Sequence, residues 1–567
     1  MKRILLFLAL ALTAASSWGK TYQYDTVPGD PLKARIYTLD NGLKVYLSSY
    51  AAEPRIQTYV AVRVGSKNDP AETTGLSHYL EHLLFKGTAS FGSTNYSAEK
   101  PLLDDIERRY EVYRTTSDEL LRRQLYREID SVSGIAAQYA IANEYDKLMS
   151  AIGAEGTNAF TSNDATVYVE NIPSNQVECW AKVQYERFAN PVLRLFHTEL
   201  EAVYEEYNRS LTSDSRKLYE ALMSGLFPNH PYGTQTTLGT QEHLKNPSIV
   251  NIKKHFAKYY VPNNMAVCLS GDFNPDEAIA TIDRYFGQLP QKPLTLAPLA
   301  PEQTLMGVDE RTVYGNEAEN IALGFRFAGG ANSEDADMLT MLDMVLCNSK
   351  AGLIDLNINK QQKLLRAGSS PLQLADRLAL TLSATPKQGQ TLEEAKALLL
   401  EQLELLKNGE FDEWLLEAVV TDFRRSTIAQ FENNNARASE MVSAFTDGKP
   451  WKEQVEMVDR LSKITKAQLV KFANERLGNS YVVVYKRTGA DPNEKKIDKP
   501  AITPIQVNRD AESPFLTDLR RAALEVKPIE PVFLDFKKDL SKLKTKAGIE
   551  VLYKQNVDNE LFELLYV

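Results

Sequence analysis

Residues 38–47 read Thr-Leu-Asp-Asn-Gly-Leu-Lys-Val-Tyr-Leu, and this stretch decides how the first part of the chain folds. Its central Asp-Asn-Gly lies between two apolar runs and supplies residues that tolerate a positive φ, so it predicts an antiparallel hairpin over residues 34–48. Residues 56–64 alternate apolar and polar side chains as a half-buried strand does, and the spacing becomes helical over residues 76–84. Strands and helices continue to mix to about residue 289. The pattern predicts an α+β domain, which with the preceding residues spans 20–290.

A charge-rich segment at 97–147 interrupts this domain. Its apolar residues recur at helical spacing in two successive stretches, which predicts a pair of amphipathic helices that protrude as a hairpin. Such an insertion either contacts a substrate or partner, or is a solvated structural elaboration, and the second case is the more common. The sequence leaves the role of the insertion open.

A second α+β unit is predicted over residues 300–487, after a short proline-rich linker. It contains a strand-like run at 321–327 and long helical patterns at 391–407 and 412–444. Residues 488–535 are again rich in proline, which is typical of an interdomain connector. The second unit is therefore expected to be joined to the last segment of the chain by a long linker.

The last segment repeats the start of the first domain. Residues 544–553 read Lys-Thr-Lys-Ala-Gly-Ile-Glu-Val-Leu-Tyr, so that Gly548 falls on Gly42 when the two stretches are aligned. Residues 536–567 are thus predicted to be the first strands of a third domain. Because a lone hairpin is only marginally stable in water, we expect the chain to be the front part of a longer protein.

Composition and charge narrow the class of protein. The 567 residues have the balance of a soluble globular chain, and the net charge of −10 argues against a nucleic-acid binder, which needs a basic footprint. Residues 1–19 combine a basic start with a short apolar run, which predicts a cleavable signal peptide and a periplasmic or secreted protein. No later stretch predicts a membrane span. Three cysteines are too few for a disulfide framework.

The predicted chemistry is carried by residues 75–88, Gly-Leu-Ser-His-Tyr-Leu-Glu-His-Leu-Leu-Phe-Lys-Gly-Thr. On a helix, His78 and His82 stand four residues apart on one face, so both imidazoles can reach one metal ion. Glu81 lies beside that ion, where it can accept a proton from a water molecule. This inverted form of the HExxH arrangement predicts a catalytic zinc site. The alternative, two helical histidines held by unrelated partners, is disfavoured by the strand, turn and helix around the motif.

A catalytic zinc site usually has a third protein ligand and one open position. The candidates lie on a predicted helix at 197–210, which reads His-Thr-Glu-Leu-Glu-Ala-Val-Tyr-Glu-Glu-Tyr-Asn-Arg-Ser. Glu199 and Glu206 are seven residues apart and lie on nearly the same face of this helix, whereas Glu205 points elsewhere. Spacing alone therefore allows either Glu199 or Glu206 to complete the site.

These residues resemble the pitrilysin/insulinase family of zinc metallopeptidases, the inverzincins, which share the His-x-x-Glu-His motif. The resemblance extends to Phe85-x-Gly87-Thr88, to Gly-Thr-Asn-Ala-Phe-Thr at 156–161 and to Tyr-Tyr-Val-Pro-Asn-Asn-Met at 259–265. It implies two homologous α/β-sandwich domains, each an antiparallel-rich sheet covered by helices, and the long type of member in which further domains come after them. It also implies one zinc ion per chain and peptide substrates.

The resemblance also implies roles for single residues. The zinc ligands are His78, His82 and Glu206. Glu81 is the general base, and Glu199 orients the site from outside the ligand set. An edge strand pairs with the backbone of an extended substrate, and aromatic side chains line the pocket beyond the scissile bond. The residues implied in substrate binding are Phe85, Asn158, Ala159 and Phe160. The alternative for these four is packing in a core or turn.

The function predicted from the sequence is a zinc-dependent endopeptidase that hydrolyses extended or unfolded peptides. In long members of the family a second half of the protein helps to hold the peptide, so a C-terminal half, supplied by the full-length chain or by a second subunit, is an implied partner. The alternative is a catalytically silent family scaffold or partner subunit that needs this half. Zinc held only for storage or structure is disfavoured, because structural sites usually use four protein ligands. The domain at 300–487 contains no histidine and cannot repeat the metal site.

Overall fold

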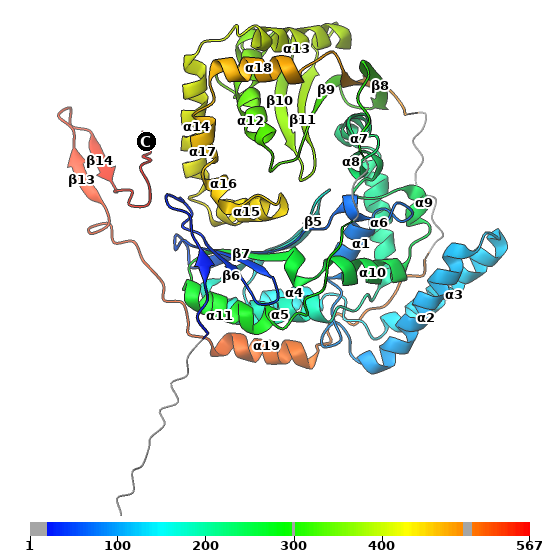
Figure 1. Cartoon of the computed structure of the whole chain (residues 1–567). Coiled ribbons are helices and arrows are strands. Elements are labelled where there is room, and N and C mark those ends of the chain that lie inside the picture. Colours follow the sequence, from blue (N-terminus) through cyan, green and yellow to red (C-terminus); the bar gives the residue numbers. More distant parts are fainter. Residues whose placement is uncertain (1–19, 297–300, 492–501) are drawn as a thin grey trace, which may run out of the picture.

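The computed structural model describes residues 20–296, 301–491 and 502–567, and Figure 1 shows their arrangement. Two sheets, each packed against helices, lie one above the other. The predicted fold class, α+β with antiparallel-rich sheets covered by helices, is confirmed. The predicted signal peptide at 1–19 lies outside the described residues.

The first sheet has the strand order β1-β2-β3-β7-β4-β6-β5, and neighbours are antiparallel except for β3 and β7. The predicted hairpin is β2–β3, in which Arg35 pairs with Leu47. At its turn Gly42 has a φ of 87° and donates its backbone N–H to the Leu39 carbonyl at 2.8 Å. The strands are β1 (Tyr24–Asp25), β2 (Arg35–Thr38), β3 (Lys44–Ser49), β4 (Arg55–Val62), β5 (Glu155–Thr161), β6 (Thr166–Pro173) and β7 (Met265–Gly271).

Helices α4, α5 and α11 cover one face of this sheet, and α1, α6 and α10 lie at its side (Figure 1). The layers share one core, in which Val60, Trp180 and Phe286 are fully buried. Burial of such apolar side chains is the main stabilising contribution to the domain. The bounds of these helices and of two short ones are α1 (Leu76–Leu83), α4 (Glu144–Ala151), α5 (Val177–Ala189), α6 (Phe196–Ser210), α8 (Pro231–Thr234), α9 (Gln241–Leu244), α10 (Ile249–Tyr259) and α11 (Pro275–Phe286).

The predicted helical insertion is a hairpin of α2 (Tyr96–Thr115) and α3 (Glu119–Ala137), which projects from the first domain in Figure 1. Its inner face is not a solvated surface, because Tyr110 and Ile129 are completely buried in the core of the domain. Its far end is solvated, and Leu120 is 77% exposed there. The hairpin therefore has one face that packs on the first domain and another that faces water.

The second sheet has the order β10-β11-β9-β12-β8, with β12 and β8 parallel. The predicted helical stretch 412–444 is two helices, since the chain turns at Phe431–Asn433 and the side chain of Asn433 caps the second helix. The strands are β8 (Val308–Gly315), β9 (Asn320–Phe327), β10 (Arg366–Gln373), β11 (Leu378–Thr385) and β12 (Tyr481–Thr488). The helices are α12 (Glu334–Leu346), a π-helix at Asp355–Asn359, α13 (Leu392–Lys407), α14 (Trp414–Gln430), α15 (Asn434–Thr446), α16 (Trp451–Val455), α17 (Met457–Leu461) and α18 (Lys466–Arg476).

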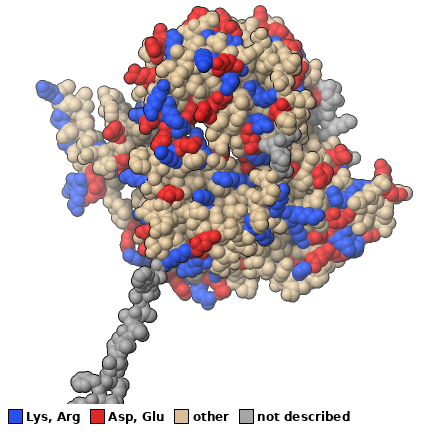
Figure 2. All heavy atoms as spheres, viewed as in Figure 1, with Lys and Arg blue, Asp and Glu red and all other residues tan. Residues whose placement is uncertain are grey.

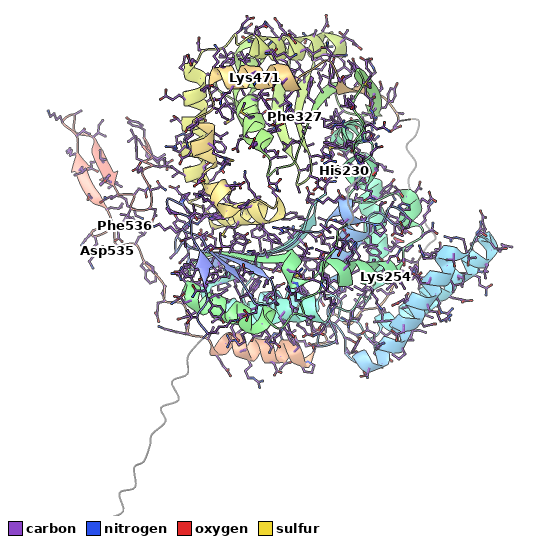
Figure 3. All side chains as sticks on the ribbon, in the orientation of Figure 1. His230, Lys254, Phe327, Lys471, Asp535 and Phe536 are labelled. Carbon is purple, nitrogen blue, oxygen red and sulfur yellow. The ribbon has the colours of Figure 1, made fainter. Side chains whose placement is uncertain are left out.

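One helix from each domain packs on the sheet of the other domain. Helix α7 (Asp214–Leu226), which precedes β7 in the chain, packs on the second sheet, and α15 from the second domain packs on β4 and β7 of the first. A buried ion pair joins Lys486 Nζ to Asp214 Oδ2 at 2.6 Å across this contact. Beside α8, His230 lies between the two sheets (Figure 3) and is completely buried. The domains are thus interlocked.

The segment after the second domain is more structured than a proline-rich connector. Its residues 514–525 form α19, which packs on α4 and α5 beneath the first sheet (Figure 1). The last strands, β13 (Ser541–Lys544) and β14 (Glu550–Tyr553), form an antiparallel hairpin. Gly548 has a φ of 86° and donates its N–H to the Thr545 carbonyl at 2.9 Å, which reproduces the turn at Gly42.

Within the described ranges, no helix combines the length and the apolar character that crossing a bilayer requires. Figure 2 shows basic and acidic side chains interspersed over the visible face, with no extended patch of one sign.

Candidate metal centre

Helices α1 and α6 bring three potential metal ligands together. His78 and His82 project from one face of α1, and their Nε2 atoms are 3.2 Å apart. Glu206, near the end of α6, places Oε2 at 3.3 Å from Nε2 of His78 and at 3.6 Å from Nε2 of His82. Across the described residues, this is the one cluster of His, Cys, Asp or Glu side chains whose ligand atoms all lie within 4.8 Å of each other.

The spacing of these atoms fits a tetrahedral metal ion. Ligand atoms about 2.1 Å from a tetrahedral zinc ion lie roughly 3.4 Å from one another, and the three distances here are 3.2, 3.3 and 3.6 Å. Two imidazole nitrogens and one carboxylate oxygen are also a donor set that catalytic zinc sites use. The residues therefore suit zinc both in geometry and in chemistry.

Glu199, one turn into α6, contacts the same site from outside. Its Oε1 accepts a hydrogen bond from Nδ1 of His82 at 3.0 Å, and its Oε2 pairs with Nζ of Lys86 at 2.6 Å. Burial would raise the pKa of Glu199, but its bonds to His82 and Lys86 hold that pKa below the ordinary value. Because Nδ1 of His82 carries the proton in this bond, the lone pair of Nε2 faces Glu206 and His78.

Glu81 lies on α1 between the two histidines and lines the same cleft. The side chain is largely buried, and its Oε2 accepts a hydrogen bond from the Thr161 hydroxyl at 2.6 Å. Thr161 is the last residue of β5, the strand at one edge of the first sheet. The carboxylate is therefore fixed between the metal-ligand helix and an edge strand.

The other predicted site residues line the same cleft, whose volume is about 680 Å³. Asn158, Ala159 and Phe160 lie on β5, and Phe160 is 49% exposed. One edge of β5 pairs with β6, with Ala159 opposite Tyr168, and at the other edge the sheet ends. Phe85 lies just after α1, and its ring lies 5.2 Å from that of Tyr145 with the Arg187 guanidinium 4.2 Å from its centre.

The start of α1 is fixed by a carboxylate from outside the helix. Gly75, its N-cap, has a φ of 83° and offers no side chain to the free backbone N–H groups. The buried Asp69 accepts instead, from the N–H groups of Gly75, Leu76 and Ser77 at 2.8, 3.1 and 3.0 Å. Burial raises the pKa of Asp69 to about 7, against the effect of these hydrogen bonds. Its oxygens supply the acceptors that the free N–H groups of a helix start need, and so orient the helix that bears both histidines.

Two residues of this site had no role in the sequence analysis. Lys86 and Thr161 both lie inside the motifs quoted there, Lys86 in Phe-Lys-Gly-Thr and Thr161 at the end of Gly-Thr-Asn-Ala-Phe-Thr. Their partners, Glu199 and Glu81, are distant in sequence, so spacing gave no signal of either contact.

Comparison with known proteins relates the chain to peptidases. A family model described as Insulinase (Peptidase family M16) matches residues 44–100, and one described as Peptidase M16 inactive domain matches residues 249–422. The zinc protease PqqE of Helicobacter pylori is 24% identical over 421 residues, which are 72% of this chain and 82% of that protein. Insulin-degrading enzyme of Mus musculus is 24% identical over 295 residues, which are 51% of this chain and only 24% of that enzyme.

Solved structures share the fold. A protease from Helicobacter pylori has a TM-score of 0.66 at 22% identity and covers 80% of this chain and 99% of its own. The periplasmic protease PqqL from Escherichia coli has a TM-score of 0.62 at 16% identity, covering 94% of this chain and 57% of its own. Pitrilysin has a TM-score of 0.60 at 16% identity, covering 93% of this chain and 52% of its own. This chain thus spans about half the length of the last two.

The chain shares the two-domain fold of these solved peptidase structures. The matches to these family models and relatives support the pitrilysin/insulinase family, peptidase family M16, for this chain.

Proposed function

We propose that this chain is a zinc-dependent endopeptidase that hydrolyses extended or unfolded peptides. The observation that carries the proposal is the convergence of His78, His82 and Glu206 on one point, beside Glu81 and an edge strand. His78, His82 and Glu206 would hold one zinc ion per chain. The names of relatives such as the zinc protease PqqE support the same metal and reaction class.

The residues divide the chemistry between them. A bound zinc ion supplies a Lewis acid that polarises the peptide carbonyl and acidifies water. Glu81 takes up the proton released by the attacking water and returns it to the departing amine, so the peptide bond is hydrolysed with no net proton change. Glu199 keeps His82 in the tautomer whose Nε2 lone pair is free, and Lys86 keeps Glu199 ionised.

The substrate is proposed to bind as an added strand at the outer edge of β5. Asn158, Ala159 and Phe160 supply backbone groups at this edge, and an extended peptide can hydrogen-bond to them while its side chains alternate in direction. Phe160 and Phe85 would contact the side chain just beyond the scissile bond. A folded protein has few segments free to pair in this way, which favours unfolded substrates.

We further propose that the chain is exported through the signal peptide at 1–19 to the periplasm, or is secreted, as the description of PqqL as a periplasmic protease suggests by similarity. A C-terminal half, from the same polypeptide or from a second subunit, is the proposed partner of the β13–β14 hairpin. The turn shared by Gly548 and Gly42 supports this, because the matching hairpin β2–β3 is completed by β7.

A second candidate function is a catalytically silent scaffold that acts only with such a half. The match of residues 249–422 to a family model called an inactive domain favours it. Against it stands the intact donor set, which lies on helices outside that range, between residues 78 and 206.

Cleavage of an internally quenched, unstructured peptide by the purified chain tests the proposal, with a chelator and with Glu81→Gln as parallel samples. Turnover that needs zinc and falls at least about 100-fold in the variant is the expected result. A chain that binds one zinc ion but stays silent, and becomes active when the C-terminal half of a long relative is added, would favour the scaffold. A chain that binds no zinc at micromolar concentration overturns the metallopeptidase proposal.

A further inference from the structure

The helix that carries Glu199 and Glu206 starts in an unusual way. Leu195, its N-cap, has a φ of 56°, a conformation that costs a branched residue free energy, and it makes no side-chain cap. The next two residues, Phe196 and His197, are both 3% exposed, so the start of α6 is held by packing and hydrogen bonding from other elements. What holds this start therefore fixes where Glu199 lies, two residues further on.

Both helices of the insertion contact the ring of His197. The Tyr110 hydroxyl on α2 lies 2.6 Å from Nδ1, and Oδ1 of Asp130 on α3 lies 3.3 Å from Nε2. Burial lowers the pKa of His197 despite the nearby Asp130 carboxylate. A neutral ring that accepts from the Tyr110 hydroxyl at Nδ1 carries its proton on Nε2, which lies within ion-pair distance of Asp130 but without hydrogen-bond geometry. The Tyr126 ring, also on α3, packs 5.0 Å from that of His197.

The start of α6 also contacts α1, the helix that carries His78 and His82. Tyr79, the neighbour of His78 on α1, donates its hydroxyl hydrogen bond to the Phe196 carbonyl at 2.5 Å, and its ring is 4.7 Å from that of Phe196. The Tyr110 ring also contacts Phe196, with the two ring centres 5.0 Å apart. Helices α1, α2, α3 and α6 therefore meet at Phe196 and His197.

We infer that the insertion is a brace for the metal centre, and that Tyr110 and Asp130 are positioning residues that set α6 against α1. This inference rests on the proposed function. Glu199 and Glu206 lie on one helix two turns apart, so a displacement at its first turn moves both carboxylates relative to His78 and His82. Their distances of 3.0 and 3.3 Å to the imidazoles leave little room for such a shift.

The outer face of the hairpin supplies a matched control. Arg109 on α2 pairs with Glu128 on α3, and Gln124 donates to Glu128 at 3.0 Å, all on the solvated side. The Glu128 side chain is 39% exposed. Glu128→Gln thus weakens a link between the two helices without touching His197, whereas Tyr110→Phe removes one buried hydroxyl and keeps the ring. Asp130→Ala is a second variant, which also releases Thr503 from its bonds at 2.7 and 3.0 Å.

The experiment measures the zinc dissociation constant of the whole chain by competition with a chromogenic chelator, alongside the melting temperature without metal. We expect Tyr110→Phe and Asp130→Ala to weaken zinc binding about 10-fold or more, the scale found for groups that orient metal ligands, and Glu128→Gln to bind as the parent does. Addition of zinc should then stabilise the two brace variants less than it stabilises the control.

If both brace variants melt at lower temperature but bind zinc with the parent's affinity, the insertion only stabilises the fold and the inference is wrong. If Asp130→Ala fails to fold, the Tyr110→Phe measurement decides alone, because it preserves the packing of the ring. A parent chain that binds no zinc refutes the proposed function instead, so the two failures are distinguishable.

Discussion

The hydroxyl of Thr161 donates a hydrogen bond of 2.6 Å to Oε2 of Glu81, and so joins the edge strand β5 to the proposed general base. The acceptor carboxyl group is largely buried, where an unmade hydrogen bond costs about 1–3 kcal/mol. The strand that is proposed to bind the substrate therefore also orients the group that activates water. We therefore expect binding of a peptide to β5 to affect the placement of Glu81.

Thr161→Val should lower kcat about 10- to 100-fold with little change in KM, because the valine side chain fills the same space but cannot hold Glu81. Thr161→Ser should retain most of the activity, since it keeps the hydroxyl. Steady-state kinetics on a quenched peptide gives both constants. An increase in KM alone, or equal losses in the valine and serine variants, would assign Thr161 to substrate contact rather than to Glu81.

Glu206 and Glu199 are expected to differ in their effect on metal binding, although the sequence alone left either as the third ligand. Glu206→Ala removes an atom 3.3 Å from His78 Nε2 and should abolish retention of zinc on dialysis. Glu199→Gln leaves the three donors in place but weakens the bond to His82 Nδ1, so it should reduce zinc affinity about 10- to 100-fold. Metal analysis after dialysis against buffered zinc distinguishes the two, and a reversed order would exchange their roles.

At the contact between the domains, the ammonium group of Lys67 pairs with two carboxylates. Nζ of Lys67 lies 2.6 Å from Asp164 on the β5–β6 turn and 2.7 Å from Asp376 of the second domain. Lys67→Met leaves both carboxylates without their cation in a partly buried site and should lower the free energy of unfolding by about 3 kcal/mol. Asp459→Asn, which breaks the exposed pair with Arg424, is the control and should cost less than about 1 kcal/mol. Equal shifts in denaturant midpoint would mean that the interdomain cluster is no more than a surface ion pair.

Much of the fold could be predicted from patterns of residues that are close together in the sequence. The turn at Gly42, the strand at 55–62 and the helix of His78 each depend on neighbours within a few residues, and each lies where the pattern predicted it. Packing partners far apart in the chain could not be predicted in this way. No periodicity indicates that α7 covers the second sheet, because its apolar face would fit any sheet of suitable shape.

The helix α19 was missed for a different reason. Prolines around residues 500–531 indicate a connector, yet Ser513-Pro514 is a recognised helix start, with the Ser513 hydroxyl accepting from Leu516 N–H at 3.3 Å and proline in the first turn. Leu516 and Leu519 are fully buried against the first domain. The number of prolines indicated a connector, whereas the position of Pro514 directly after Ser513 indicated the start of a helix.

The last prediction concerns pH and the second domain. Burial raises the pKa of Asp343 on α12 from 3.8 to about 6, although the Ser369 hydroxyl donates to its Oδ1 at 2.6 Å. Below about pH 4 the folded and unfolded states both hold this proton; between about pH 4 and 6 the folded state alone holds it, so stability falls as pH rises through that window. At about 1.4 kcal/mol per pKa unit the loss is at most about 3 kcal/mol, and partial exposure reduces it to about 1–2 kcal/mol. Asn at this position stays neutral and still accepts from Ser369, so Asp343→Asn should melt like the parent at pH 4 and at a higher temperature at pH 8. Melting curves of the two chains that run parallel over this range would show that Asp343 is ionised in the folded state.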